Sequence, residues 1–327
     1  MAFPRTRMRR LRRSARLREM VAESRLDVGD LVAPLFVRQG TEAPVPIASL
    51  PGVSQHTLGS LVKEARRLAD LGVPALVLFG IPQTKDARGS QAWSPDGIVQ
   101  VALESLREAL AEQMVLIADL CLDEYTDHGH CGVLDATGAV DNDATLELYG
   151  QVALAQARAG ADLVAPSGMM DGQVAAIRDA LDESGRSDVG ILAYAAKFAS
   201  ALYGPFRDAA DVTIAGGGDR KGYQQDPRNL REAVREVELD VAEGADMVMV
   251  KPALTYLDVI SAVRRQVAVP LAAYHVSGEY AMVKAAAERG WVDGQAVALE
   301  QLGAIKRAGA DIVLTYFAGE VAEALRA

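Results

Sequence analysis

The sequence predicts an α/β fold, a (β/α)8 TIM barrel with an N-terminal arm. Eight short apolar runs recur along the chain, and most gaps between them hold one amphipathic helical stretch. Continuous apolar runs are typical of parallel strands covered on both faces, and eight strand–helix units complete such a barrel. The expected strands are residues 31–37, 75–80, 115–120, 163–167, 191–194, 247–251, 271–276 and 311–316.

Glycine marks the end of several expected helices. The helical stretch 64–71 is followed by Gly72 and then by an apolar run. The same order recurs where Gly160, Gly244 and Gly309 each precede Ala-Asp and an apolar run. Glycine after a helix accepts the left-handed backbone conformation without a Cβ clash. These glycines therefore place the boundaries between helix and strand.

An open doubly wound sheet is the alternative fold. That fold favours a Gly-rich phosphate-binding turn directly after the first strand. Here the strand at 31–37 continues into Arg38-Gln39-Gly40, which lacks this fingerprint. The barrel is therefore favoured, with residues 31–327 forming one catalytic domain.

The charge of the chain is unevenly distributed. The 327 residues carry a formal net charge of -10, yet residues 1–20 hold eight arginines and one acidic residue, Glu19. Residues 1–30 precede the first strand and form the expected arm. A basic arm suits nucleic acid, but this one has no interleaved aromatic residues, and the acidic body would repel phosphate. We expect the arm to contact another copy of the chain, with no nucleic-acid partner.

The sequence gives no sign of a membrane or a secretory route. No apolar run reaches the roughly 18 residues that a membrane helix needs, and the N-terminus lacks a signal-peptide pattern. The two cysteines, Cys121 and Cys131, are too few for a disulfide framework. A cytoplasmic protein with no membrane partner is expected.

A lysine stands at the end of two expected strands. Lys251 follows the apolar run 247–250, and Lys197 comes shortly after the run 191–194. Lysine is rarely buried unless it is paired or functional, and desolvation at the barrel mouth favours the neutral, nucleophilic amine. A single lysine would more often extend to solvent. Two on adjacent strands favour imine formation with ketone carbonyls.

The residues Cys121, Asp123 and Cys131 have the spacing of metal ligands. Cys-x-Asp places two side chains on one side of an extended segment, and the following loop returns the second cysteine. Two thiolates and a carboxylate can hold zinc with a fourth position open. His128 and His130 are possible further ligands. The alternatives are two inert cysteines or an adventitious disulfide.

Residues 203–227 form too long a segment for an ordinary βα loop, which favours a lid. The three glycines at 216–218 allow it to bend. Arg207, Arg220 and Lys221 offer cations to a carboxylate. The alternative is a solvated surface loop. The glycine triplet is a weak phosphate signal, because no Gly-Lys-Ser/Thr follows it.

The stretch 244–256, which reads GADMVMVKPALTY, is similar to the segment around the Schiff-base lysine of the porphobilinogen synthase (delta-aminolevulinic acid dehydratase) family. Supporting matches run through nearly the whole chain, so the resemblance is highly specific. They lie at 4–13, 123–132, 141–145, 165–173, 197–200, 203–207, 218–221, 276–280 and 316–317.

The resemblance implies condensation of two 5-aminolevulinate molecules to porphobilinogen with loss of two waters, a step of tetrapyrrole and haem biosynthesis. It implies that Lys251 forms an imine with the A-side substrate and Lys197 with the P-side substrate. Further substrate contacts are implied: Ser277 and Tyr316 to the P-side carboxylate, Arg207, Lys221 and Gln224 to the A-side carboxylate, and Asp119 and Ser167 near the P-side molecule.

The resemblance also implies metals. Family members with catalytic zinc have three cysteines in the loop, whereas others carry Asp and other residues and need no zinc there. Here Asp123 stands between Cys121 and Cys131, and a carboxylate makes the ligand set harder, which weakens the preference for zinc and admits Mg2+ or no metal. Zn2+ remains the leading expectation. Glu236, on an expected helix, corresponds to the family's allosteric Mg2+ ligand.

The family is usually a homo-octamer in which the N-terminal arm wraps a neighbouring barrel, which gives the arginine-rich arm a purpose. Two other functions stay open. A Schiff-base aldolase would need one lysine and usually a phosphate site after the last two strands, where Glu279 fits poorly. A nucleic-acid-binding protein would use the arm.

Overall fold

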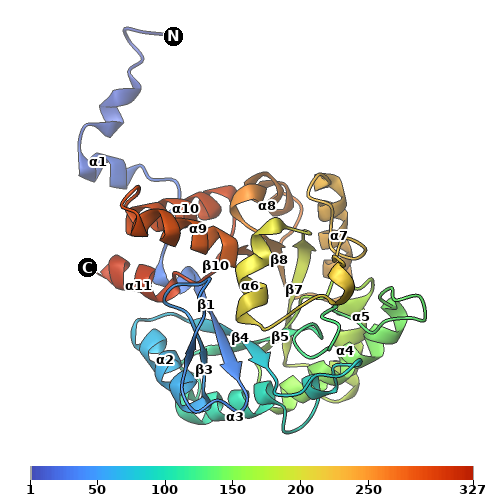
Figure 1. The fold of residues 1–327 in the computed structure, drawn as a ribbon. Helices are drawn as coiled ribbons and strands as arrows, with labels where there is room; N and C mark the ends of the chain where they lie inside the picture. Colours follow the sequence, from blue (N-terminus) through green and yellow to red (C-terminus); the bar gives the residue numbers. More distant parts are fainter. Residues whose placement is uncertain (1, 327) are drawn as a thin grey trace.

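The computed structural model describes residues 2–326 and contains a closed barrel of parallel strands (Figure 1). The strands follow one another around the barrel in sequence order, and β1 pairs with β10 at Leu31↔Val313 and Val32↔Leu314, which closes the ring. The predicted (β/α)8 barrel is confirmed. Its strands are β1 (Leu31–Arg38), β4 (Ala75–Ile81), β5 (Val115–Leu120), β6 (Leu163–Pro166), β7 (Gly190–Lys197), β8 (Met247–Lys251), β9 (Leu271–His275) and β10 (Ile312–Thr315).

Helices surround the barrel strands, as Figure 1 shows. The predicted helix-ending glycines have positive φ, with values of 101° at Gly160, 106° at Gly244 and 121° at Gly309. At the other end of a helix, the side chain of Asp141 accepts a hydrogen bond of 3.1 Å from the Ala144 N–H. The α-helices are α1 (Ala15–Met20), α2 (Leu58–Asp70), α3 (Ile98–Leu110), α4 (Asn142–Arg158), α5 (Gln173–Glu183), α6 (Gly204–Ala209), α7 (Leu230–Ala242), α8 (Leu257–Arg264), α9 (Ser277–Glu288), α10 (Gly294–Ala308) and α11 (Ala318–Arg326).

Two short strands after β1 are not among those predicted. β2 (Val45–Pro46) pairs antiparallel with β3 (Ser54–His56), and β3 runs parallel to β1 with Phe36 opposite Gln55. Strands of two and three residues contain too few side chains to form a recognisable apolar run. The Gln55 Nε2 donates to the Ala209 carbonyl at 2.8 Å, so the hairpin of β2 and β3 is hydrogen-bonded to α6.

Short 3-10 helices fill several of the connections, and the lid segment packs on the barrel mouth. The Phe206 ring, in α6, lies 5.9 Å from Phe36 and 5.1 Å from Phe79, between ring centroids. Apolar contact therefore holds this part of the segment over the strand ends. The 3-10 helices are η1 (Met8–Arg12), η2 (Val28–Asp30), η3 (Ser90–Ala92), η4 (Ala201–Tyr203), η5 (Ala215–Gly217) and η6 (Leu254–Tyr256).

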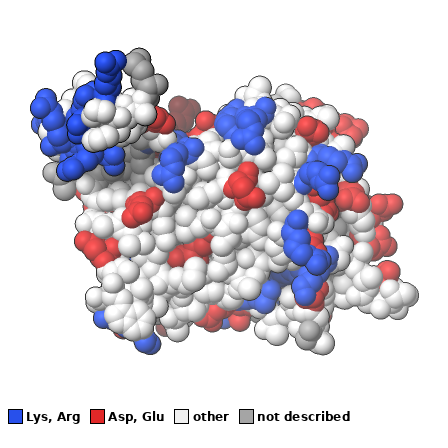
Figure 2. Space-filling model, turned by 90° about the horizontal axis from the view of Figure 1, so that it is seen from above, with Lys and Arg blue, Asp and Glu red and all other residues white. Residues whose placement is uncertain are grey.

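The arm extends away from the barrel (Figure 1), and its arginine side chains form a basic patch (Figure 2). Three of its large apolar side chains are also exposed, to 75% at Phe3, 70% at Met8 and 69% at Met20. Isolated exposed apolar residues are ordinary, but several on one projecting segment suit a protein contact. Within residues 2–326, no helix is both long enough and apolar enough to span a membrane.

Candidate active site and metal centre

The two predicted lysines lie side by side in the barrel mouth. Lys197 ends β7 and Lys251 ends β8, and the two are partners in the parallel ladder that joins these strands. Only 5% of Lys197 and 4% of Lys251 is exposed. Their Nζ atoms lie 5.6 and 5.0 Å from the ring of Tyr194, so neither side chain extends to solvent.

Lys251 is enclosed by aromatic rings. Its Nζ lies 4.5 Å from the ring centroid of Tyr274, 5.1 Å from Phe206 and 5.4 Å from Tyr203. Burial and, after it, the neighbouring ammonium of Lys197 together lower the pKa of Lys251 to about 7. A large fraction of Lys251 is therefore the neutral amine at neutral pH, which is the nucleophilic form.

Lys197 has a more polar environment. Its Nζ donates to the Ser167 carbonyl at 2.6 Å, and the Ser167 hydroxyl donates to Asp119 Oδ2 at 3.1 Å. Although burial alone would lower it, the pKa of Lys197 is raised overall because Cys131 and Cys121 lie close by. Burial raises the pKa of Asp119 to about 6. Asp119 and Ser167 thus lie beside Lys197, and their contact with substrate stays a prediction.

The predicted metal ligands converge. One ligand atom each from Cys121, Asp123 and Cys131 can be chosen so that all three lie within 4.8 Å of one another, and all three residues are buried. Both cysteines are free thiols, so the alternative of a disulfide between them is not seen. The hydroxyl of Tyr149, in α4, donates to the Cys131 carbonyl at 2.7 Å and lies 3.9 Å from Cys121 Sγ, which fixes the loop. This set of two sulfurs and a carboxylate could hold a metal ion.

The two histidines of the loop do not join this set. His128 Nε2 lies 3.2 Å from the Ala87 carbonyl oxygen, and its Nδ1 accepts from the His130 N–H at 3.1 Å. His130 Nδ1 lies 3.1 Å from the Tyr223 hydroxyl. Three of their four ring nitrogens thus have partners within the chain, and a role of either histidine as a further metal ligand stays a prediction.

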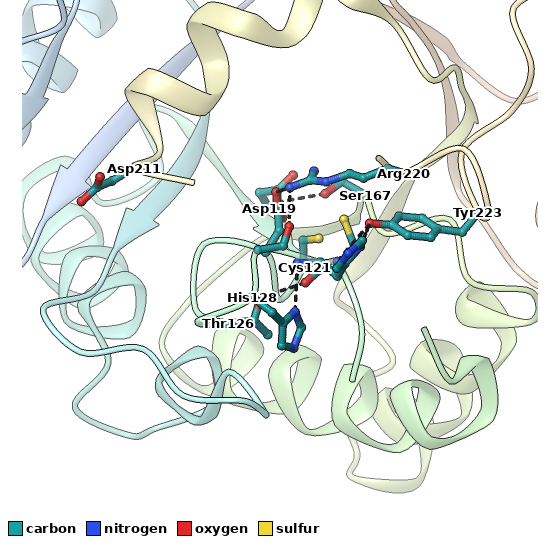
Figure 3. A network of polar contacts seen from close by, with 12 residues as sticks. Asp119, Cys121, Thr126, His128, Ser167, Asp211, Arg220 and Tyr223 are labelled. Carbon is teal, nitrogen blue, oxygen red and sulfur yellow. Dashed lines mark hydrogen bonds and ion pairs between the residues drawn. The ribbon is translucent and has the colours of Figure 1, made fainter. Parts of the chain in front are cut away.

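The buried position of Arg220 is not evident from the sequence. It is expected as a lid cation, yet it reaches inward (Figure 3), and its Nη2 lies 2.8 Å from Asp123 Oδ2, with both side chains almost fully buried. The same nitrogen donates to the Gly129 carbonyl at 2.8 Å. Burial alone would raise the pKa of Asp123, but Arg220 and then Lys197 hold it well below its usual range. The lid and the metal loop are thus joined by a buried ion pair.

The predicted carboxylate-binding residues divide into two groups. Gln224 is buried, whereas Arg207 is exposed. Lys221 is also exposed, and its ammonium pairs with Asp219 at 3.0 Å. The structure therefore does not bring Arg207 and Lys221 to the buried site, and Arg220 occupies the place expected of such a cation. The roles of Arg207 and Lys221 stay predictions.

Ser277 and Tyr316 lie on the Lys251 side of the mouth. The Tyr274 hydroxyl donates to the Tyr316 hydroxyl at 3.3 Å, and the ring of Tyr274 contacts Lys251. Ser277 follows β9, the strand that pairs with β8. Strand order therefore places Ser277 and Tyr316 on the side of Lys251, and the substrate molecule that they hold stays a prediction.

Several polar atoms in the site have no hydrogen-bond partner among the described residues. A buried polar atom without a partner costs free energy, so a cluster of them indicates where a polar ligand binds. Tyr194, which the sequence analysis missed, lies between the lysines and is one of them. The atoms are Asp119 Oδ1, Glu124 Oε1, Tyr194 Oη, Arg220 Nε and Gln224 Nε2.

Glu236 lies apart from the lysines, on α7. It lines a cavity of about 580 Å³ together with Asp171, Glu232 and Gln224. Burial raises the pKa of Glu236, and the carboxylate of Asp171 adds to the shift. The neighbouring Asp240 is buried, and burial followed by Glu236 raises its pKa to about 8. Such mutually repelling carboxyl groups are of the kind that a divalent cation stabilises.

Comparisons with known proteins identify the family of this chain. A family model described as delta-aminolevulinic acid dehydratase matches residues 5–324. The delta-aminolevulinic acid dehydratase of Streptomyces coelicolor is 56% identical over 327 residues, which cover 99% of this chain and 98% of the relative. The Mycobacterium tuberculosis protein of the same name is 57% identical over 323 residues, with 98% of each chain covered.

A solved structure is also similar. The delta-aminolevulinic acid dehydratase (porphobilinogen synthase) of Toxoplasma gondii, crystallised with the reaction product porphobilinogen, superposes with a TM-score of 0.95 at 46% identity. The match covers 97% of this chain and 91% of that one. Fold and site define a barrel enzyme with paired lysines. The chain belongs to the delta-aminolevulinic acid dehydratase family.

The buried ion pair between Arg220 and Asp123 is expected to stabilise the fold. Arg220→Gln leaves the Asp123 carboxylate without its cation, so the free energy of unfolding falls by about 3–5 kcal/mol, measured by urea titration at matched protein concentration. Lys221→Gln, which removes the exposed neighbouring charge, changes it by less than about 1 kcal/mol. Adding Asp123→Asn to the Arg220→Gln protein recovers part of the loss. An Arg220→Gln protein as stable as the wild type contradicts a buried pair.

Proposed function

We infer that this chain condenses two molecules of 5-aminolevulinate to porphobilinogen with loss of two waters, a step of tetrapyrrole synthesis. The observation that carries this is the pair of buried lysines, Lys197 and Lys251, opposite each other on adjacent strands. The names of the relatives and the product bound in the Toxoplasma gondii structure support the same reaction.

Each lysine serves one substrate molecule in this proposal. Lys251 takes the molecule whose carboxylate is held by Ser277 and Tyr316, the P-side molecule, because Tyr274 links Tyr316 to its amine. Lys197 takes the A-side molecule, whose carboxylate meets Gln224. This exchanges the two lysines relative to the sequence expectation.

On the A side, Arg220 is proposed to assist Gln224 in holding that carboxylate, because both are buried and each has a side-chain nitrogen without a partner among the described residues. Arg207 and Lys221, which are both exposed, are proposed to act at the entrance to the site instead.

The chemistry begins at the neutral amine. The nitrogen lone pair of Lys251 attacks the ketone carbon, the carbonyl oxygen takes up protons and leaves as water, and a protonated imine remains. That imine withdraws electrons from the neighbouring carbon atoms, which acidifies their C–H bonds. Asp119, whose pKa is near 6, lies where it can accept or return a proton.

The group Cys121, Asp123 and Cys131 is proposed to hold Zn2+ beside the Lys197 half-site. The donors fit this ion, since two thiolates and one carboxylate oxygen leave a fourth tetrahedral position. When bound there, zinc supplies Lewis acidity to a substrate oxygen. Asp123 Oδ2 already pairs with Arg220, so the other oxygen of this carboxylate is the one proposed as the metal ligand.

A second metal is proposed at α7. Glu236 is proposed to bind an allosteric Mg2+, helped by the neighbouring carboxylates of Asp171 and Glu232 in the same cavity. This cavity also contains Gln224 from the lid, so a cation at Glu236 lies within reach of the segment that closes the site.

The arm is proposed to hold neighbouring copies in a homo-octamer. Its exposed apolar residues and its arginines suit contacts with an acidic barrel of another copy. A cytoplasmic location is part of the proposal, because a reducing compartment keeps Cys121 and Cys131 as metal-binding thiols.

Trapping of the imine tests the role of Lys251. Borohydride added with 5-aminolevulinate reduces the imine to a stable amine, which mass spectrometry locates on Lys251. Because the amine must be neutral to attack, the trapping rate rises with pH through an apparent pKa near 7. Lys251→Ala abolishes the label at this position and the activity, whereas Lys284→Ala, outside the mouth, leaves both unchanged. A rate that is flat from about pH 5 to 9 contradicts a depressed pKa.

Chelation and metal return test the two metal sites. Removing bound metal lowers porphobilinogen formation, and zinc alone restores it, with about one zinc per chain retained by the wild type and less than a tenth of that by Cys131→Ala, measured by metal analysis. Added Mg2+ raises the rate further, and Glu236→Gln removes only this response. Full activity without any zinc rules out the first site, and a normal Mg2+ response in Glu236→Gln rules out the second.

Deletion of residues 1–20 tests the arm. The shortened chain is expected to sediment as smaller assemblies than the intact chain and to lose most of its activity, because contacts between copies are lost. A matched variant with the eight arginines changed to lysine keeps the charge and retains the large assembly. Loss of nucleic-acid binding alone, with assembly and activity intact, would instead make the arm a nucleic-acid-binding segment.

A further inference from the structure

We propose that Glu279 is a positioning residue that sets the distance between Lys251 and Ser277 and thereby fits this half-site to a five-carbon keto acid. The inference rests on the proposed function, in which Lys251 takes the carbonyl carbon and Ser277 the carboxylate of one molecule. Glu279 lies in the first turn of α9 and is only 1% exposed. It is not one of the residues assigned above to substrate or metal.

The carboxylate of Glu279 bonds to two separate loops. Its Oε2 accepts from the Val276 N–H and its Oε1 from the Leu254 N–H, each at 2.7 Å. Val276 directly precedes Ser277, and Leu254 is the third residue after Lys251. The N–H groups of Ala253 and Thr255 also face the carboxylate. One side chain therefore ties the end of β8 to the end of β9.

An ordinary helix cap does not account for this arrangement. A glutamate at this place in a helix commonly bonds back to the N-terminal N–H, here that of Val276. The bond to Leu254 reaches a different loop, in η6 after β8, and contributes nothing to the cap. A buried carboxylate is costly unless it is well bonded. Its complete burial between the two loops indicates a role in holding them together.

The same two strand ends also bond to the segment after β7. The Lys251 carbonyl accepts from the Phe198 N–H at 2.9 Å, and the Ser277 hydroxyl donates to the Leu202 carbonyl at 3.3 Å. These contacts hold each strand end against the segment after β7, but none of them joins the two ends to each other. The ladder between β8 and β9 runs to the pair Val250↔Ala273. Beyond that pair Glu279 connects the two loops, so its loss allows the amine and the carboxylate-binding hydroxyl to move apart.

Two ketones separate this effect from the reactivity of the lysine. 4-Oxopentanoate carries the keto group and the carboxylate of the substrate, and butanone is the same ketone without the carboxylate. Both form an imine at Lys251 that borohydride traps and mass spectrometry locates. The ratio of their trapping rates measures how well the carboxylate contact and the amine act together on one molecule.

The test variant is Glu279→Gln, which keeps the size of the side chain but places an amide NH2 against one of the two backbone N–H donors. We expect the rate ratio of 4-oxopentanoate to butanone to fall by about 10- to 100-fold, because a displacement near 1 Å costs on the order of 100-fold in such reactions. The butanone rate itself stays within about twofold. Glu288→Gln, at an exposed position of the same helix, leaves the ratio unchanged.

Glu279→Asp provides the second variant, because it keeps the charge and only shortens the reach, and its ratio falls in the same direction. An unchanged ratio in the folded variants overturns the inference. An equal loss of both rates also overturns it, since that result means general damage to Lys251. If the wild-type protein traps neither ketone at Lys251, the proposed function fails instead.

Discussion

Closure of the sheet between β1 and β10 is the constraint on which the site depends. The ladder of two residue pairs there makes the parallel strands a ring, so the strand ends meet at one mouth. Asp119, Ser167, Lys197 and Lys251 come from four strands or strand ends spread over more than a hundred residues, yet they become neighbours. An open sheet would spread the same side chains along an edge that solvent reaches.

The ionisable groups enclosed in the mouth balance one another's charges. Lys197, Lys251 and Arg220 face the carboxyl groups of Asp119 and Asp123, all within the closed site. The two lysines nevertheless differ in pKa. That of Lys251 is lowered among aromatic rings, whereas that of Lys197 is raised beside the two cysteine sulfurs, where its ammonium also donates to a carbonyl. Because Arg220 arrives from the lid, the charge balance of the metal loop is complete only when this segment is in place.

Much of this arrangement follows from local sequence. The strands are predictable because parallel buried strands are continuously apolar, and the lysines because a charge ends each of two such runs. The Cys-Asp-Cys loop is predictable from its spacing. Other features depend on three-dimensional placement: Arg220 and Lys221 are adjacent in sequence, yet one is buried and the other exposed. The pairing of Tyr316 with Lys251, through Tyr274, follows from strand order and side-chain direction, which a motif does not encode.

The partnerless polar atoms of the mouth bear on substrate discrimination. Asp119 Oδ1, Tyr194 Oη and Gln224 Nε2 are desolvated whether or not a suitable molecule arrives. A compound that supplies their partners recovers this cost, whereas a compound of similar shape with a methyl group in place of a polar one leaves it uncompensated. Sites of this kind reject such isosteres by about 10,000-fold or more. Selectivity in this barrel thus comes less from favourable contacts with the substrate than from the free energy lost when an isosteric compound leaves these polar atoms without partners.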